Sequence, residues 1–114
     1  MTAREYLEKK KEATMVTFVI RKAEKDTDSP FYDSVYRGTP IRTAGEWLRD
    51  FTWPEKYIVI NADHPPIDST GHWLRMYKSG YLLCAMITTE EELIRHYGEK
   101  KGRDMIAYYN RTVK

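Results

Sequence analysis

The densest group of reactive side chains lies in the segment ADHPPIDSTGHW, residues 62–73. It contains two carboxylates and two imidazoles, at Asp63, His64, Asp68 and His72. Side chains of these types bind divalent metals, and beside a serine hydroxyl they support hydrolysis. The segment follows an apolar run, and ligands commonly bind beyond the carboxyl ends of strands in an open sheet. The sequence therefore makes this loop a candidate binding site, with a small metal-dependent or hydrolytic enzyme as one alternative.

The spacing within this loop matches no catalytic or metal-binding motif. Pro65 and Pro66 interrupt any helical spacing between His64 and Asp68, and neither HExxH nor GxSxG is present. A structural role is simpler, in which Asp68 or Ser69 caps a following helix. We therefore predict no metal, no cofactor and no catalytic residue, and we favour a non-enzymatic protein.

Twelve residues of the chain occur twice. Residues 40–51 read PIRTAGEWLRDF and residues 66–77 read PIDSTGHWLRMY, with six identical positions. Each copy is followed by an apolar run, at 57–61 and 81–87. This pattern predicts a tandem helix-then-strand repeat over 40–61 and 66–87, with Trp47 and Trp73 packed in the core.

The repeat also pairs two arginines, Arg49 and Arg75. Each follows a leucine and points about 100° away from it on a helix. If the two copies are related by pseudo-symmetry, both guanidinium groups can line one surface. Such a surface would bind an anion or a carboxylate on a partner.

A second basic group lies near the C-terminus, where cations alternate with aromatic side chains. It comprises Lys100, Lys101, Arg103, Tyr108 and Arg111. Basic residues interleaved with aromatics are typical of nucleic-acid binding. Glutamates at 90–92 and 99 reduce the local positive charge, and no signature of a known nucleic-acid-binding fold is present. Nucleic-acid binding through this region is a second alternative.

Local signals place the first helix and the strands around it. Thr2 and Glu5 have capping-box spacing and start a helix that extends to about Lys11. The β-branched run at 15–20 predicts a central strand buried on both faces, and 31–36 predicts an edge strand after Pro30.

The second half of the chain is predicted to alternate helices and strands. Thr43 and Glu46 cap the helix of the first repeat copy, which Pro54 ends. A matching helix in the second copy ends near Gly80, so the strands at 57–61 and 81–87 are expected to be parallel neighbours. A helix then begins at Thr88 or Thr89, and glycines at 98 and 102 divide the rest into two helices.

Composition limits the class of protein. The chain has 114 residues, of which 41% are hydrophobic and 32% charged, and a net charge of +2. It suits one domain, 1–114, of α/β or α+β class, with helices on a small mixed sheet of about four strands. No apolar run is long enough to cross a membrane, and the charged N-terminus does not resemble a secretory signal. With the single cysteine, Cys84, in an apolar run, these features favour the cytoplasm.

Two long segments of the chain resemble short uncharacterised proteins of bacteriophages and prophages. They are FYDSVYRGTPIRTAGEWL and YIVINADHPPIDSTGHWLRMYKSGYLLCAMITTEEEL. The resemblance implies an accessory protein that binds and blocks or redirects a host factor, including components of antiphage defence, and it implies no catalytic residue. The expected partner is a host protein or a small signalling ligand, and the sequence leaves its identity and the oligomeric state open.

Overall fold

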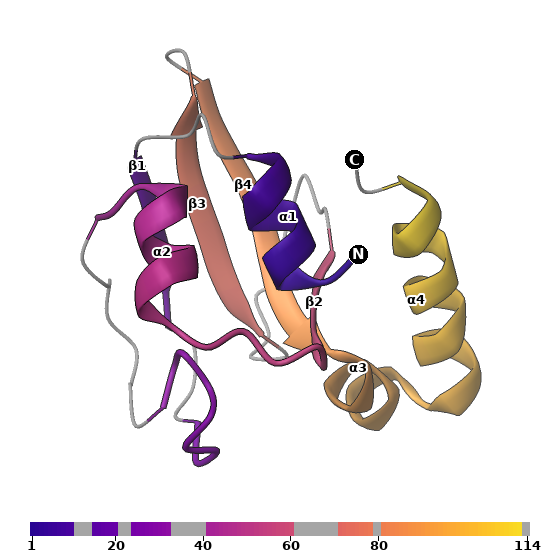
Figure 1. The fold of residues 1–114 in the computed structure, drawn as a ribbon. Helices are drawn as coiled ribbons and strands as arrows, with labels where there is room; N and C mark the ends of the chain where they lie inside the picture. The colour runs from indigo at the N-terminus through magenta and orange to yellow at the C-terminus, as the bar shows by residue number, and fades with distance from the viewer. Residues whose placement is uncertain (11–14, 21–23, 33–40, 61–70, 79–80, 113–114) are drawn as a thin grey trace.

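Helices and strands alternate in an order that the sequence pattern predicts only in part. The computed structural model describes residues 1–10, 15–20, 24–32, 41–60, 71–78 and 81–112. The elements in these ranges, labelled in Figure 1, are α1 (Ala3–Lys9), β1 (Met15–Val19), α2 (Ala44–Asp50), β2 (Tyr57–Ile60), β3 (His72–Lys78), β4 (Tyr81–Thr89), α3 (Glu90–Tyr97) and α4 (Glu99–Thr112). The α+β class and the compact single domain are as expected from the sequence.

The four strands form one sheet in the order β1-β3-β4-β2. All three pairings are antiparallel, so the expectation of a mixed sheet is wrong. The strands β2 and β4 are neighbours as predicted, but they are antiparallel rather than parallel. The reason is that β3, and not a helix, precedes β4 and pairs with it, so the chain returns beside β2 in the opposite direction.

The two repeat copies adopt different structures where both are described. Trp47 lies in helix α2, whereas the matching Trp73 lies in strand β3. The predicted second helix is therefore wrong, and the repeat is not a structural duplication. In β3 the side chains of Trp73 and Leu74 point to opposite faces of the sheet, since the strand alternates with a period of two. The predicted end of that helix at Gly80 lies outside the described residues.

The predicted central strand at 15–20 is also misplaced, because β1 lies at one end of the strand order. Val16 and Phe18 are fully buried, but Met15 is 43% exposed. Met15 and Val19 lie on the opposite, partly covered face of the sheet. Apolar residues therefore occupy both faces of this outer strand, which is why its sequence resembles that of a central strand. Of the predicted strand at 31–36, Phe31 and Tyr32 are described, and Tyr32 forms a single parallel bridge with Glu24.

Three of the predicted helix starts are confirmed, at Thr2, Thr43 and Thr89. Thr2 and Thr43 each form a complete capping box, in which the Oγ1 atom accepts a hydrogen bond from the backbone N–H of Glu5 and Glu46 at 3.1 Å. The Thr89 Oγ1 atom accepts an equivalent hydrogen bond from the backbone N–H of Glu92 at 3.1 Å. These bonds satisfy N–H groups that the first turn of a helix leaves without intrahelical acceptors.

The predicted division of the C-terminal region into two helices is confirmed as well. Gly98 ends α3 with a φ of 93°, a conformation that glycine adopts at low cost. One turn later Gly102 is buried against α3, where an added Cβ atom would lie 2.8 Å from the Cα atom of Ile94. The two glycines let α4 fold back closely against α3.

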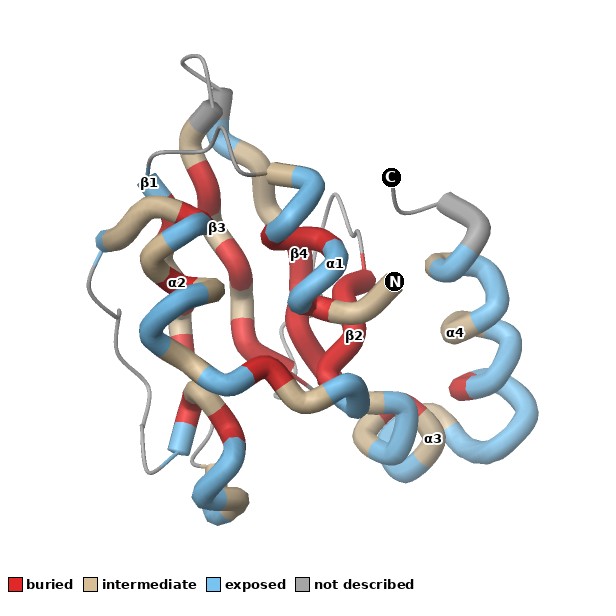
Figure 2. Tube along the Cα trace, viewed as in Figure 1, coloured by how far each residue is buried: buried red, intermediate tan, exposed pale blue. Residues whose placement is uncertain are grey.

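The two faces of the sheet are covered to different extents (Figure 2). On the first face, α1 and α2 close a large core that includes Phe18, Leu74 and Ile87. Trp47 lies in this core and donates an indole hydrogen bond to the backbone carbonyl of Val16 at 2.9 Å. On the second face, α3 and α4 cover a smaller cluster formed by Ile58, Ile60, Met86 and Leu93.

Candidate functional site

The loop predicted to carry the binding site is described only at its end. Asp63, His64 and Asp68 lie outside the described residues, so their role stays a prediction. His72 is described and is 1% exposed. Its Nε2 atom lies 2.9 Å from the Oε1 atom of Glu24, and its ring centroid lies 4.4 Å from that of Phe31. The imidazole therefore packs inside the first-face core rather than facing a ligand.

The two arginines of the repeat do not share a surface. Arg49 lies on α2, above the first face, and its Nε atom is 2.7 Å from the Oδ1 atom of Asp50. Arg75 lies on β3 between Leu74 and Met76, which are both buried in the first-face core. Because strand side chains alternate, Arg75 points to the second face. The predicted common surface is absent because one copy of the repeat is a helix and the other a strand.

The basic residues predicted for nucleic-acid binding all belong to α4. Lys100, Lys101, Arg103 and Tyr108 are exposed, and the side chain of Arg111 lies outside the described part. The Arg103 Nε atom is 2.6 Å from the Oε1 atom of Glu99, and this hydrogen bond raises the pKa of the Arg103 guanidinium. The Nζ atom of Lys101 lies 5.4 Å from the ring centroid of Tyr97. The helix is thus basic, with one of its cations neutralised locally.

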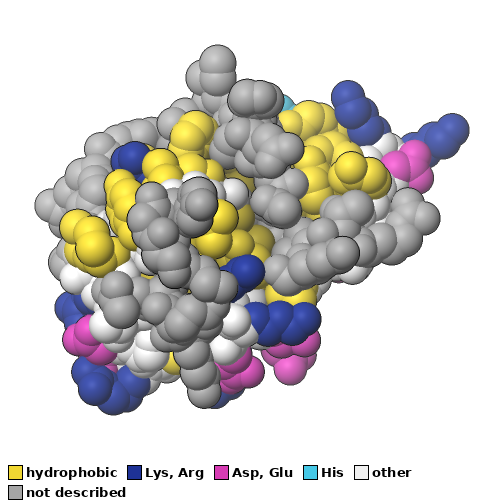
Figure 3. All heavy atoms as spheres, turned by 90° about the horizontal axis from the view of Figure 1, so that it is seen from above, with side chains coloured by type: hydrophobic (Ala, Val, Ile, Leu, Met, Phe, Trp, Pro, Cys, Tyr) yellow, Lys and Arg dark blue, Asp and Glu magenta, His cyan; other side chains and the backbone are white. Residues whose placement is uncertain are grey.

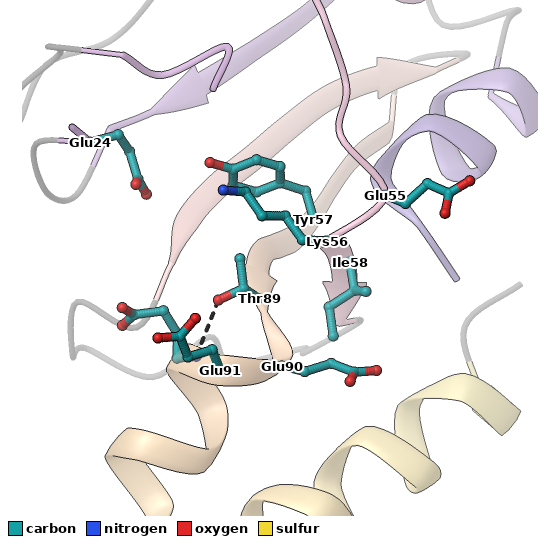
Figure 4. Close-up of a pocket in the computed structure, with 9 residues that line it drawn as sticks. Glu24, Glu55, Lys56, Tyr57, Ile58, Thr89, Glu90 and Glu91 are labelled. Carbon is teal, nitrogen blue, oxygen red and sulfur yellow. Dashed lines mark hydrogen bonds between the residues drawn. The ribbon is translucent and has the colours of Figure 1, made fainter. Parts of the chain in front are cut away.

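A pocket of about 450 Å³ lies where β2 meets the start of α3. Its lining is rich in carboxylates and comprises Glu24, Glu55, Lys56, Tyr57, Ile58, Thr89, Glu90, Glu91 and Glu92. The carboxylates come from different segments and do not converge on one point (Figure 4). Among the described residues no group of three or more histidine, cysteine or acidic side chains is placed to hold a metal ion.

The charges at this pocket are tied to neighbouring groups. Lys56 donates a hydrogen bond to Asp26, which lowers the pKa of the Asp26 carboxyl and raises the pKa of Lys56. Burial raises the pKa of the Tyr57 hydroxyl, so this side chain stays neutral at physiological pH. The pocket offers negative charge but no converging set of acid, base and nucleophile.

The second face of the sheet is only partly buried over β1, β3 and the adjoining part of β4. We call this surface the open sheet face and define it as Met15, Thr17, Arg75, Tyr77, Leu82 and Cys84. The register places these residues in two rows across the sheet, Met15–Tyr77–Leu82 and Thr17–Arg75–Cys84. Leu82 is 45% exposed, and among the described elements α3 and α4 cover only the neighbouring cluster around Met86.

Hydrophobic side chains are also visible at the surface in the space-filling view. Seen from above, they gather in one area over the β1, β3 and β4 side and in another beside α4 (Figure 3). The carboxylates in this view lie at the edges of these areas rather than within them. An exposed apolar area of this kind, set on a rigid sheet, is typical of an interaction surface.

Both outer strands of the sheet are paired with short segments. Val16 of β1 exchanges backbone hydrogen bonds with Arg42, at 2.7 and 3.0 Å. At the opposite edge, the backbone N–H of Val59 donates to the carbonyl of Met1 at 3.0 Å, and Thr2 forms a bridge with Ile58. These contacts occupy part of each edge, which limits strand addition by a partner.

Sequence reasoning missed the open sheet face. One signal was present, because two residues, Ser79 and Gly80, separate two apolar runs and such spacing is typical of a β-hairpin. The pairing of Lys78 with Tyr81 shows that the flanking strands do form this hairpin. With the hairpin assigned, Trp73, Arg75 and Tyr77 fall on one face of a strand.

The chain matches no family model, no curated protein and no solved structure. None of the helices in the described ranges has the length and apolar character needed to span a membrane.

Proposed function

We propose that this protein is a non-enzymatic binding protein that contacts a macromolecular partner through the open sheet face. The observation that carries the proposal is the incomplete cover of that face. Met15 and Leu82 are 43% and 45% exposed at the ends of one cross-strand row. A contiguous apolar area on a sheet, unlike a single exposed hydrophobic residue, is typical of a surface that a partner covers.

The surroundings of this face support binding rather than catalysis. Three of its six side chains, Met15, Tyr77 and Leu82, are apolar or aromatic, and the six project from three neighbouring strands. A sheet holds such side chains in fixed positions, which lowers the entropy cost of binding. The resemblance to phage accessory proteins agrees with a role in the cytoplasm that blocks or redirects a host factor.

The single cysteine of the chain allows a direct test, because Cys84 belongs to the open sheet face. The rate at which N-ethylmaleimide alkylates Cys84 can be measured by mass spectrometry, with and without dialysed bacterial extract. We expect the extract to slow alkylation, because a bound partner covers the thiol. The substitution Leu82→Asp should abolish this protection, since it places a charge on the apolar part of the open sheet face, in the row next to Cys84.

A matched control places the thiol on the other side of the molecule. The variant Cys84→Ala/Glu8→Cys carries its cysteine on an exposed position of α1, over the first face. Extract should leave its alkylation rate unchanged. Equal protection at both positions, or none at Cys84 with any extract fraction, would overturn the proposed function.

A further inference from the structure

We infer that the partner of the open sheet face is a single-stranded nucleic acid, with a phosphate bound at Arg75 and a base stacked on Tyr77. The inference rests on the binding function proposed above and names the class of ligand. It follows from the charge and the ring positions on β3.

Arg75 differs from the other arginines whose side chains are described. Those five each have a carboxylate within ion-pair distance, in the pairs Arg4–Glu8, Arg42–Asp50, Arg49–Asp50, Arg95–Glu92 and Arg103–Glu99. Among the described residues, none of the ion pairs involves Arg75, although its side chain is partly buried on an apolar face. A guanidinium in such surroundings favours an anionic partner, and its planar fork suits a phosphate group.

The strands themselves present no negative charge to such a ligand. Their sequences, MVTFV, YIVI, HWLRMYK and YLLCAMITT, contain no aspartate or glutamate. The carboxylates of the acidic pocket lie outside the strands, with Glu24 and Glu55 in connecting segments and the glutamates at 90–92 beyond the end of β4. A polyanion lying across β1, β3 and β4 therefore meets Arg75 without repulsion from the sheet surface.

Aromatic rings flank Arg75 at regular intervals. Trp73 and Tyr77 lie two residues before and two residues after it, so all three side chains project from the same face of β3. Successive side chains on one face of a strand are about 6.6 Å apart. Trp73 packs against the second-face cluster, so Tyr77 is the ring beside Arg75 that an unpaired base can stack on while its phosphate binds the guanidinium.

One flank of α4 carries a further cation and a further aromatic ring. The side chain of Asn110 accepts a hydrogen bond from the Met1 amino group at 2.8 Å, which places that flank of α4 beside the β2 edge. Lys101 and Tyr108 lie on the opposite flank, given 100° per residue. Tyr108 is 53% exposed and the Lys101 Nζ atom lies 5.4 Å from the Tyr97 ring centroid, so this flank presents a ring and a cation on the side away from the Met1 contact.

Fluorescence anisotropy with labelled single-stranded oligonucleotides of about 15 residues, in about 50 mM salt, tests the inference. We expect micromolar affinity that weakens steeply as salt is raised, because counterions are released on binding. Arg75→Ala and Tyr77→Ala should each weaken binding by about tenfold or more, since one removes the phosphate contact and the other the stacking ring. Tyr77→Phe should retain binding, because it keeps the ring.

Arg103→Ala is the matched control, because Arg103 is exposed on α4 and already pairs with Glu99. It should change the affinity by less than about threefold. Thermal unfolding of each variant shows whether its fold is retained. If Tyr77→Ala is unfolded, the comparison of Arg75→Ala with Arg75→Lys, which keeps the charge, decides the outcome.

The outcomes separate this inference from the proposed function. A flat titration at low salt, or binding that Arg75→Ala and Tyr77→Ala leave unchanged, would overturn the assignment of a nucleic acid to this face. If extract then still protects Cys84 after nuclease treatment, the partner is a protein and the binding function stands. If neither extract nor oligonucleotide protects Cys84, both fail.

Discussion

His72 has the chemistry of a metal ligand or a catalytic base, yet its surroundings give it a structural role. It is fully enclosed, its ring packs on Phe31, and its Nε2 atom meets Glu24 at 2.9 Å. The partner is 48 positions away in the chain, so no local pattern predicts the contact. The sequence identified a reactive residue correctly but could not show that the fold turns it inward.

The His72–Glu24 contact should contribute measurably to stability. Glu24→Ala leaves a buried ring nitrogen without this partner, and we expect the free energy of unfolding to fall by about 1–3 kcal/mol. Glu24→Gln should cost less, because the amide can still form a hydrogen bond with the imidazole. Urea denaturation followed by circular dichroism measures both changes.

Glu55→Ala provides the comparison, since Glu55 is exposed and lines the same acidic pocket. Its unfolding midpoint should match that of the unmodified chain. Equal midpoints for the Glu24→Ala and Glu55→Ala variants would contradict a stabilising role for the buried pair.

At the scale of elements, the matched segments at 40–51 and 66–77 show what local sequence decides. The first copy carries Thr43 and Glu46, which close a capping box and start α2. In the second copy His72 replaces the glutamate and Met76 replaces Asp50, so the reciprocal cap is lost and the polar face with it. Capping residues predict the start of every described helix except α4. They do so because a cap depends only on residues within four positions of one another.

Strand order was not predictable in the same way. It depends on pairings such as Phe18 with Leu74 and Ile60 with Met86, which join distant parts of the chain. A wrong helix at 73–77 therefore produced a wrong crossover and a wrong strand direction. The error affects only the sheet. Because of it, the sequence did not predict the open sheet face.

Two helical glycines should respond in opposite ways to alanine. At Gly102 the new methyl group would lie 2.8 Å from the Ile94 Cα atom, so Gly102→Ala should cost about 1–3 kcal/mol of unfolding free energy by overpacking. At Gly45 the nearest heavy atom to the new Cβ is 4.0 Å away, so Gly45→Ala should stabilise by up to about 1 kcal/mol.

Chemical denaturation of both variants measures this difference in sign. The helix propensity gained is similar at the two sites, so the difference reports the close approach of α3 and α4. If Gly102→Ala were as stabilising as Gly45→Ala, the crossing of the two helices would be looser than the structure indicates.

At the scale of the whole molecule, one sheet separates two cores of unequal size. Among the described residues, the first-face core contains sixteen buried side chains and the second-face cluster contains four. Helices α3 and α4 are therefore held to the sheet by little apolar area, and they leave the open sheet face uncovered. No property of a single segment predicts this asymmetry, because it arises from how many helices reach each face.

The same asymmetry predicts that α3 and α4 can detach while the rest stays folded, since regions with few buried contacts open first. Leu93 is fully buried in the second-face cluster, and Leu93→Ala should remove about 2–5 kcal/mol from that layer. Native-state hydrogen exchange should then accelerate in α3 and α4, while the amides of β3 and β4 keep most of their protection. Leu7→Ala, which opens an equivalent cavity in the first-face core, should instead accelerate exchange in the sheet. If Leu93→Ala accelerated exchange equally in β3, β4 and α4, the two layers would unfold as one unit, and the open sheet face would be part of a single cooperative core.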